Sequence, residues 1–300
     1  MTSRSRAATV DLDAAADFMA AHARLLDRRR FDVLLRGAEP DGALVALDAY
    51  RNAHGGYGWG LEPDLRDSRS QPAPALHAFE VFEDIGPATS TRAAELCDWL
   101  ASVTLADGGL PFAVPVERSA GCAPFWTDAD PGSSSLQITA IVTAMAHRVA
   151  RHDTALAGHP WLQRATEYCL TVIGEQGEEA DPMALAFSMQ ALDVVGRPEA
   201  ESLVDRLGAR IPGDGMMKVV GGSPDEYMRP LDFSPLPGGP VRKLLRADVI
   251  DAELDRLEAR QEDDGGWRVD FASYSQAGEL EWRGHMTVNA LALLKRNGRL

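Results

Sequence analysis

Apolar residues recur at three- and four-residue intervals along most of the chain. Between residues 11 and 29, for example, Leu12, Phe18, Met19, Leu25 and Leu26 follow this spacing, which places them on one face of an α-helix. No run of alternating polar and apolar residues, the pattern of a half-buried strand, interrupts these segments. The spacing predicts helices over residues 11–29, 41–53, 74–85, 90–105, 134–149, 160–173, 182–195, 199–211, 247–261 and 285–296.

Three of the predicted helices run into the same kind of turn, in which a polar residue and a glycine pair precede a bulky apolar residue. The turns are His54-Gly55-Gly56-Tyr57, Asp107-Gly108-Gly109-Leu110 and Asp264-Gly265-Gly266-Trp267. Because glycine tolerates a left-handed backbone, such a pair ends a helix and reverses the chain. The first two turns lie about fifty residues apart, which is room for two helices and their loops. We therefore expect roughly five to six copies of a helical hairpin.

Nearly all-apolar helices alternate with more charged ones along this repeat. Residues 136–146 and 183–192 are almost entirely apolar, whereas residues 161–173 and 248–260 carry more charge. An inner ring of buried helices inside a half-exposed outer ring produces this contrast. We therefore predict an all-α fold, an α/α toroid, formed by a single domain that spans residues 1–300. The alternative is an open helical solenoid.

Composition and charge narrow the possible partners. The formal net charge is −15, so the surface repels nucleic acid, and we expect no nucleic-acid partner. None of the three cysteines belongs to a CxxC pair, which is typical of a reducing compartment. No apolar run is as long as a membrane span, and residues 1–10 lack an apolar signal core. These features predict a cytoplasmic protein, and we expect no cofactor.

The turns and the helix after the last of them resemble a known superfamily. Gln261-x-x-Asp264-Gly265-Gly266-Trp267 resembles the Gln/Trp repeat motif of squalene and hopene cyclases, and the Asp-Gly-Gly-aromatic turn is similar to one in protein prenyltransferase β subunits. The segment that begins with His285 is similar to the final core helix of those subunits, which also opens with a His. The resemblance implies the α/α toroid of terpenoid cyclases and prenyltransferases.

The chain also departs from the catalytic motifs of these proteins. Protein prenyltransferases bind zinc through an Asp, a Cys and a His, but Asp270-Phe271-Ala272 has Ala where that Cys is needed, so we expect no metal there. Class II cyclases carry Asp-x-Asp-Asp, whose middle Asp protonates an alkene. The nearest string is Asp128-Ala129-Asp130-Pro131, in which the fourth position is Pro131.

The long loop between residues 112 and 137 is the first candidate site. It precedes a buried helix and contains two carboxyls beside an aromatic residue. An acid that protonates an alkene must be held neutral by a second carboxyl or by an apolar wall. We expect Asp130 to be the acid, with Asp128 as its support and Trp126 as its wall. The alternative is that Asp130 and the serines after it only cap the helix that follows.

Two further segments are candidate ligand-binding regions. The loop from 54 to 71 is dense in polar and aromatic residues: His54, Tyr57, Trp59, Glu62, Asp64 and Gln71. Its aromatic faces suit cationic intermediates, although the same residues also suit a well-packed loop. Around the last turn, Trp267, Trp282 and His285 form the second group, in which His285 is a base, a ligand or a structural residue. The Pro- and Gly-rich stretch 213–240 replaces an expected inner helix, and we interpret it as a lid.

Three functional hypotheses follow. The resemblance implies a protein that binds an isoprenoid or similar apolar ligand in a central cavity, with acid-initiated cyclisation as its chemistry. A saccharide-active α/α-barrel hydrolase or lyase is the first alternative, and it requires Glu62 or Asp64 to face Asp128 or Asp130 across a polar groove. A non-catalytic binding scaffold is the second.

Overall fold

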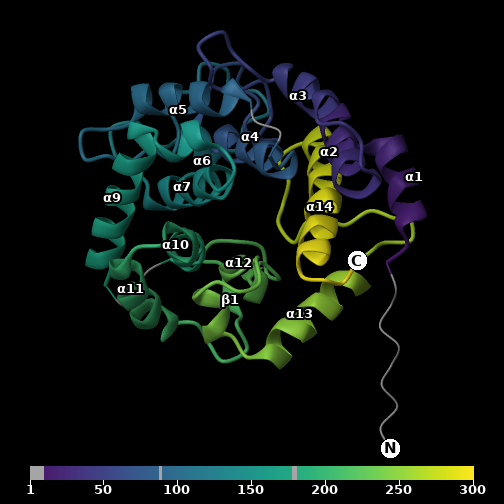
Figure 1. Cartoon of the computed structure of the whole chain (residues 1–300). Helices are drawn as coiled ribbons and strands as arrows, with labels where there is room; N and C mark the ends of the chain where they lie inside the picture. Colours follow the sequence, from purple (N-terminus) through teal and green to yellow (C-terminus); the bar gives the residue numbers. More distant parts are fainter. Residues whose placement is uncertain (1–9, 88–89, 178–180) are drawn as a thin grey trace, which may run out of the picture.

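The computed structural model describes residues 10–87, 90–177 and 181–300. Its helices form two concentric rings, seen from one end in Figure 1. The outer ring contains α1 (Leu12–His22), α3 (Asp41–Asp48), α5 (Thr91–Val103), α9 (Pro160–Glu175), α11 (Pro198–Gly208) and α13 (Ala247–Ala259). The inner ring contains α2 (Leu25–Arg36), α4 (Pro72–Asp84), α7 (Leu136–Ala150), α10 (Pro182–Val195), α12 (Pro230–Phe233) and α14 (Gln276–Arg296).

Neighbours in the inner ring pack against one another in chain order, from α2 to α4, α7, α10 and α12, and α14 returns to α2. The remaining elements are short: α6 (Pro124–Thr127), α8 (Thr154–Ala157), the 3-10 helix η1 (Val241–Leu244), and strands β1 (Met217–Lys218) and β2 (Tyr227–Met228), which pair antiparallel. The all-α toroid predicted from the sequence is therefore confirmed, with six hairpins in the described part of the chain.

The glycine turns explain how the ring closes. Gly265 has a φ of 89°, and Gly266 lies so close to α1 that a Cβ there would stand 2.8 Å from the Phe18 ring. The last turn therefore docks against the first helix of the chain. Beside it, the Gln261 amide donates to the Asp11 carbonyl at 2.7 Å and accepts from the Asp11 amide at 2.8 Å. The start of the first helix and the last glycine turn are therefore joined by close backbone packing and by two hydrogen bonds.

The other two glycine turns pack in the same way, each against the next outer helix. A side chain at Gly56 would collide with Ser70 and with Trp99 of α5, and one at Gly109 would collide with Tyr168 of α9. The apolar residue after each pair is buried, as Leu110 and Trp267 show. Each glycine turn of the repeat inferred from the sequence thus fixes the distance from one outer helix to the next.

The largest differences from the predicted elements are at the first and last helices. The segment 11–29 is two helices, because the chain turns at Ala23 and Arg24 between α1 and α2. The last helix begins at Gln276 rather than at His285, and the Ser275 hydroxyl caps it by accepting from the Gly278 amide. His285 consequently lies inside α14. The chain also contains the short β1–β2 pair, which the sequence pattern did not predict.

No helix in the described ranges combines the length and the apolar character needed to cross a membrane. The three cysteines are free thiols.

Candidate functional site

A cavity of about 920 Å³ occupies the middle of the ring. Inner-ring residues supply most of its apolar wall: Leu76, Ile138, Ile141, Val142, Met145, Met183, Phe187, Leu231 and Leu293. Its volume lies within the range of about 300–1,000 Å³ that small-molecule sites occupy in proteins. The toroid therefore encloses space for a ligand instead of filling its axis with side chains.

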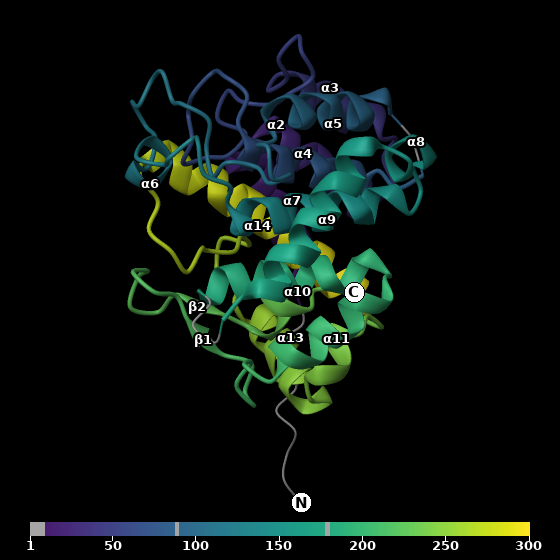
Figure 2. The same cartoon turned by 90° about the vertical axis from the view of Figure 1, so that its left-hand side faces the viewer.

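One part of the wall is aromatic. Trp126 stacks on Phe112 with ring centroids 4.6 Å apart, and Phe125 packs against both Trp126 and Tyr274. Trp126 is buried, and its indole nitrogen has no hydrogen-bond partner in the described chain. Figure 2 shows α6, the β1–β2 pair and the loop that precedes α14 on one face of the ring. Because Phe125 and Tyr274 are exposed and also line the cavity, this face forms its entrance.

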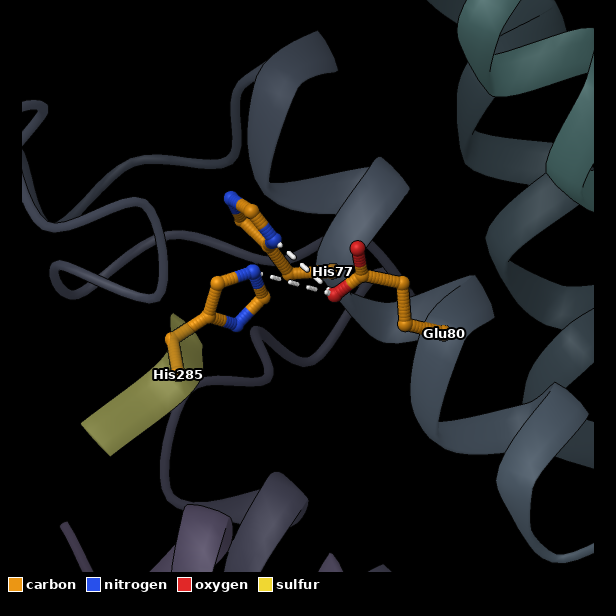
Figure 3. A group of neighbouring side chains, drawn as sticks. All are labelled: His77, Glu80 and His285. Carbon is orange, nitrogen blue, oxygen red and sulfur yellow. Dashed lines mark hydrogen bonds and ion pairs between the residues drawn. The ribbon is translucent and has the colours of Figure 1, made fainter. Parts of the chain in front are cut away.

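A cluster of ionisable residues lines the cavity between α4 and α14. The imidazole of His77 lies between two carboxylates, with Nε2 2.9 Å from Oε2 of Glu62 and Nδ1 3.2 Å from Oε2 of Glu80. The same Glu80 oxygen is 3.6 Å from Nε2 of His285 (Figure 3). The two imidazole rings meet edge to face at 4.7 Å. Helical geometry explains part of this arrangement, because His77 and Glu80 are three residues apart on one face of α4.

Burial and charge divide these groups into different protonation states. Burial disfavours a charged His77, but Glu80 and Glu62 outweigh it and raise the pKa of His77 to about 9. Burial also opposes ionisation of Glu80, yet His285, His77 and Arg30 hold the pKa of that carboxyl well below its usual range. For His285, burial and the positive charges of His77 and Arg30 outweigh the negative charge of Glu80, and its pKa falls to about 3. At neutral pH, Glu80 is ionised, His77 is protonated and His285 is neutral.

Arginines on the inner ring complete this polar wall. The Arg30 guanidinium bonds Asp84 at 2.7 Å and Asn289 at 3.0 Å, and Arg296 bonds Asp84 at 3.0 Å. Arg148 donates to Gln190 at 2.8 Å and stands 4.0 Å from the Glu83 carboxylate. Buried charges are stable only when they are paired in this way.

A second acidic group lies elsewhere on the wall, on α12 and α13. Asp232 accepts a hydrogen bond from the Arg229 amide at 2.7 Å, and its carboxylate has no ion-pair partner within the described ranges. Glu253, by contrast, is bonded twice by Arg256. Burial raises the pKa of Asp232 to about 6, and the negative charge of Glu253 adds to that effect. Asp232 is therefore a carboxyl that binds a proton near physiological pH.

The structure brings five of the expected site residues to the cavity wall: Trp126, Glu62, Asp64, Trp282 and His285. Asp64 accepts from the Trp282 indole at 2.7 Å, from the Tyr274 amide at 3.2 Å and from the Ser273 hydroxyl at 3.3 Å. These three donors hold Asp64 in place and tie α14 and the loop before it to the loop before α4.

The expected acid pair does not reach the cavity. Asp128 and Asp130 are both exposed. Asp130 accepts from the Ser133 hydroxyl at 2.5 Å and from the Gly132 amide at 2.9 Å, and these bonds lower its pKa. A solvated carboxyl with a lowered pKa is a poor proton donor. Asp130 thus organises its own loop.

Five other expected ligand residues lie outside the cavity lining. His54 is exposed and stacks on Trp99, and Trp59 is exposed at 57%. Tyr57 is fully buried in the core. The Gln71 amide bonds both backbone groups of Val114, and the Trp267 indole donates to the Leu257 carbonyl at 2.8 Å. These residues hold loops and hairpins together.

Sequence reasoning missed His77, Glu80 and Asp232. The available signal was the presence of His77 and Glu80 inside an otherwise apolar inner helix, where a polar residue needs a reason to be buried. Asp232 lies in the stretch 213–240, whose residues Val219, Ser223 and Tyr227 also line the cavity. That stretch therefore covers the cavity, and its movement as a lid stays a prediction.

Neither a protein-family model nor a curated protein matches this sequence. Among solved structures, the chain is similar to a variant of the type II terpene cyclase MstE from Scytonema, determined without a ligand. The TM-score is 0.51 at 14% sequence identity, and the match covers 94% of this chain and 85% of that chain. This likeness confirms the terpenoid-cyclase-like toroid as the fold, and at such low identity it shows the fold alone.

Proposed function

We propose that this terpene-cyclase-like toroid binds an isoprenoid or a similarly extended apolar molecule in its central cavity, and that Asp232 starts an acid-catalysed cyclisation there. The cavity of about 920 Å³, with its aliphatic and aromatic wall, carries the proposal. Long apolar ligands gain binding free energy from burial in such a wall, at about 25 cal/mol per Å². The stacked rings of Trp126 and Phe112 offer π faces that favour a nearby positive charge.

The proposed chemistry is proton transfer followed by ring closure. The Asp232 carboxyl gives its proton to one alkene carbon, and the π electrons form the new C–H bond and leave a carbocation. A second alkene of the same ligand closes the ring by attacking that cation. Loss of a proton from the product cation returns one proton to the site, so the reaction needs no further reactant.

Burial raises the pKa of Asp64 and of Asp84 as well, but Asp232 is preferred because those two carboxylates, like Glu62 and Glu80, have cationic partners or several hydrogen-bond donors. Glu62 and Glu80 flank His77, Asp84 binds two arginines, and Asp64 accepts three hydrogen bonds. Asp232 accepts one backbone hydrogen bond, and burial raises its pKa to about 6. We expect turnover to fall as the pH rises through that value, since the carboxyl then loses the proton it must donate.

The saccharide alternative loses its supporting geometry. It required Glu62 or Asp64 to face Asp128 or Asp130 across a groove, but the first two line the cavity and the last two are exposed. A non-catalytic scaffold is separated from an enzyme by experiment, because it would bind the ligand without converting it. We also propose a cytoplasmic location, which the three free thiols fit.

The test combines ligand identification with two matched variants. Organic extracts of the purified protein are searched by mass spectrometry, and the protein is incubated with linear polyenes and prenyl diphosphates of increasing length. We expect a cyclic product from the wild type and from Asp130→Asn, and none from Asp232→Asn, which should still bind the substrate. Equal turnover by both variants would remove Asp232 as the acid. Absence of both a bound isoprenoid and turnover would overturn the functional proposal itself.

A further inference from the structure

We propose that His77, Glu80 and His285 bind a divalent transition-metal ion, with Zn²⁺ as the best match, at the wall of the central cavity. One donor atom from each side chain lies within 4.8 Å of the other two (Figure 3). Two imidazole nitrogens and one carboxylate oxygen form a donor set that proteins use for zinc and for ferrous iron. The proposal is independent of the isoprenoid chemistry described above.

The donor spacing fits a metal ion once the Asn289 side-chain amide, which stands 2.8 Å from Nε2 of His285, turns away from that nitrogen. Zinc lies about 2.1 Å from nitrogen and oxygen ligands, so two neighbouring ligands of a tetrahedral site stand about 3.4 Å apart. The Glu80 oxygen is 3.2 Å from Nδ1 of His77 and 3.6 Å from Nε2 of His285. All three residues also line the cavity, which leaves a coordination position open towards a ligand.

The surroundings of His77 are those of a metal-bound histidine. Its Nε2 lies 2.9 Å from a Glu62 carboxylate oxygen, and Glu62 is itself buried. A carboxylate that accepts the N–H of one ring nitrogen directs the lone pair of the other nitrogen to the metal. In His77 that other nitrogen is Nδ1, the one that faces Glu80.

The charge of the polar wall also suits a divalent cation. Five carboxylates, on Glu62, Asp64, Glu80, Glu83 and Asp84, accompany the three guanidinium groups of Arg30, Arg148 and Arg296. His77 carries a proton before the ion binds and releases it on coordination. With both imidazoles then neutral, the wall carries an excess of two negative charges. A divalent ion would balance that excess inside a cavity where an unbalanced charge is costly.

Arg30 is the competing cation. Its Nη1 stands 3.6 Å from the Glu80 oxygen and 3.3 Å from Nδ1 of His285. The same guanidinium is anchored by Asp84 and by Asn289, which draw its other two nitrogens away from Glu80. Arg30 therefore lowers the affinity for a metal ion by repulsion, and the proposed ion approaches Glu80 from the cavity side.

This ligand set differs from the Asp, Cys and His set of the protein prenyltransferases. Two of its three members, His77 and Glu80, come from α4 near the beginning of the chain. Only His285 belongs to the last helix.

Metal binding can be measured without any organic substrate. The protein is freed of metal with a chelator, dialysed, and titrated with Zn²⁺ by calorimetry and with Co²⁺ by visible absorption. We expect one ion per chain and cobalt d–d bands of a site with nitrogen ligands. Glu62→Gln should weaken binding about 10- to 100-fold, as loss of an outer-shell carboxylate does in other sites.

The ligand variants decide the proposal. Glu80→Gln keeps the size of the side chain and should remove binding, and His285→Ala should do the same, whereas the exposed His54 serves as the control in His54→Ala. Circular dichroism establishes that each variant is folded. Binding that survives Glu80→Gln and His285→Ala, or is absent from the folded wild type, would overturn the metal site. Either result leaves the isoprenoid test unaffected.

Discussion

The carboxylate of Asp232 makes the folded protein less stable at neutral pH, and Asp232→Asn should remove that penalty. Burial raises the pKa of Asp232 from its ordinary value of 3.8 to about 6, so the folded chain holds this proton more tightly than the unfolded chain does. Stability therefore falls as the pH rises from about 4 to about 6. A difference of about two pKa units, at about 1.4 kcal/mol per unit, amounts to roughly 3 kcal/mol.

Urea unfolding followed by circular dichroism at pH 4 and pH 7 measures this effect. The difference in unfolding free energy between Asp232→Asn and wild type should rise by about 2–3 kcal/mol from pH 4 to pH 7, because the groups common to both proteins cancel. Asp130→Asn is the matched control, since hydrogen bonds from Ser133 and Gly132 lower the pKa of Asp130 and its stabilisation is lost as the pH falls. If the unfolding free energy of Asp232→Asn differs from that of wild type by the same amount at pH 4 and pH 7, burial does not raise the pKa of Asp232.

Three further outcomes concern the ring and its wall, with stability measured by urea unfolding and affinity by fluorescence titration. Gly265→Ala should destabilise the protein by more than about 2 kcal/mol, because its Cβ would overlap the Ala14 carbonyl, whereas Gly298→Ala, with a similar φ and open space, should cost about 1 kcal/mol. Gln261→Ala removes both hydrogen bonds to Asp11 and should lower the unfolding free energy by about 1–2 kcal/mol. An unchanged urea midpoint would exclude a role of Gln261 in ring closure. Trp126→Ala should weaken binding of a long-chain polyene at least tenfold, whereas Trp59→Ala, at an exposed position, should leave the affinity unchanged. Equal affinities of the two variants would show that the aromatic wall does not contact the ligand.

The fold was largely predictable because its signals are local. Each glycine pair follows the end of an outer helix within several residues. The alternation of apolar and charged helices indicates which ring a helix joins. The start of α14 was misplaced because its first nine residues, from Gln276 to Gly284, are mostly polar or small and half of the helix lacks an apolar face. The Ser275 cap was the signal that could have corrected it.

The site was less predictable because it depends on which way loops and inner helices face. Asp130 lies beside Asp128 and near Trp126, as an acid would, although Pro131 replaces the last Asp of the cyclase motif. Its loop directs it to solvent, where Ser133 holds it ionised. Glu80 and His285 are separated by about two hundred residues in the chain, and only ring closure brings α4 and α14 together. Burial, which raises the pKa of Asp232, likewise follows from tertiary packing.

The most direct test of an isoprenoid-binding cavity is to locate the ligand by anomalous scattering. Crystals soaked with a brominated polyprenyl compound should show a bromine peak inside the cavity, among Trp126, Met145 and Phe187. The peak should disappear in Leu76→Trp, which fills the cavity, and persist in Val45→Trp, which alters an exposed position on α3. Bromine confined to the outer surface, or a peak that survives Leu76→Trp unchanged, would contradict the account.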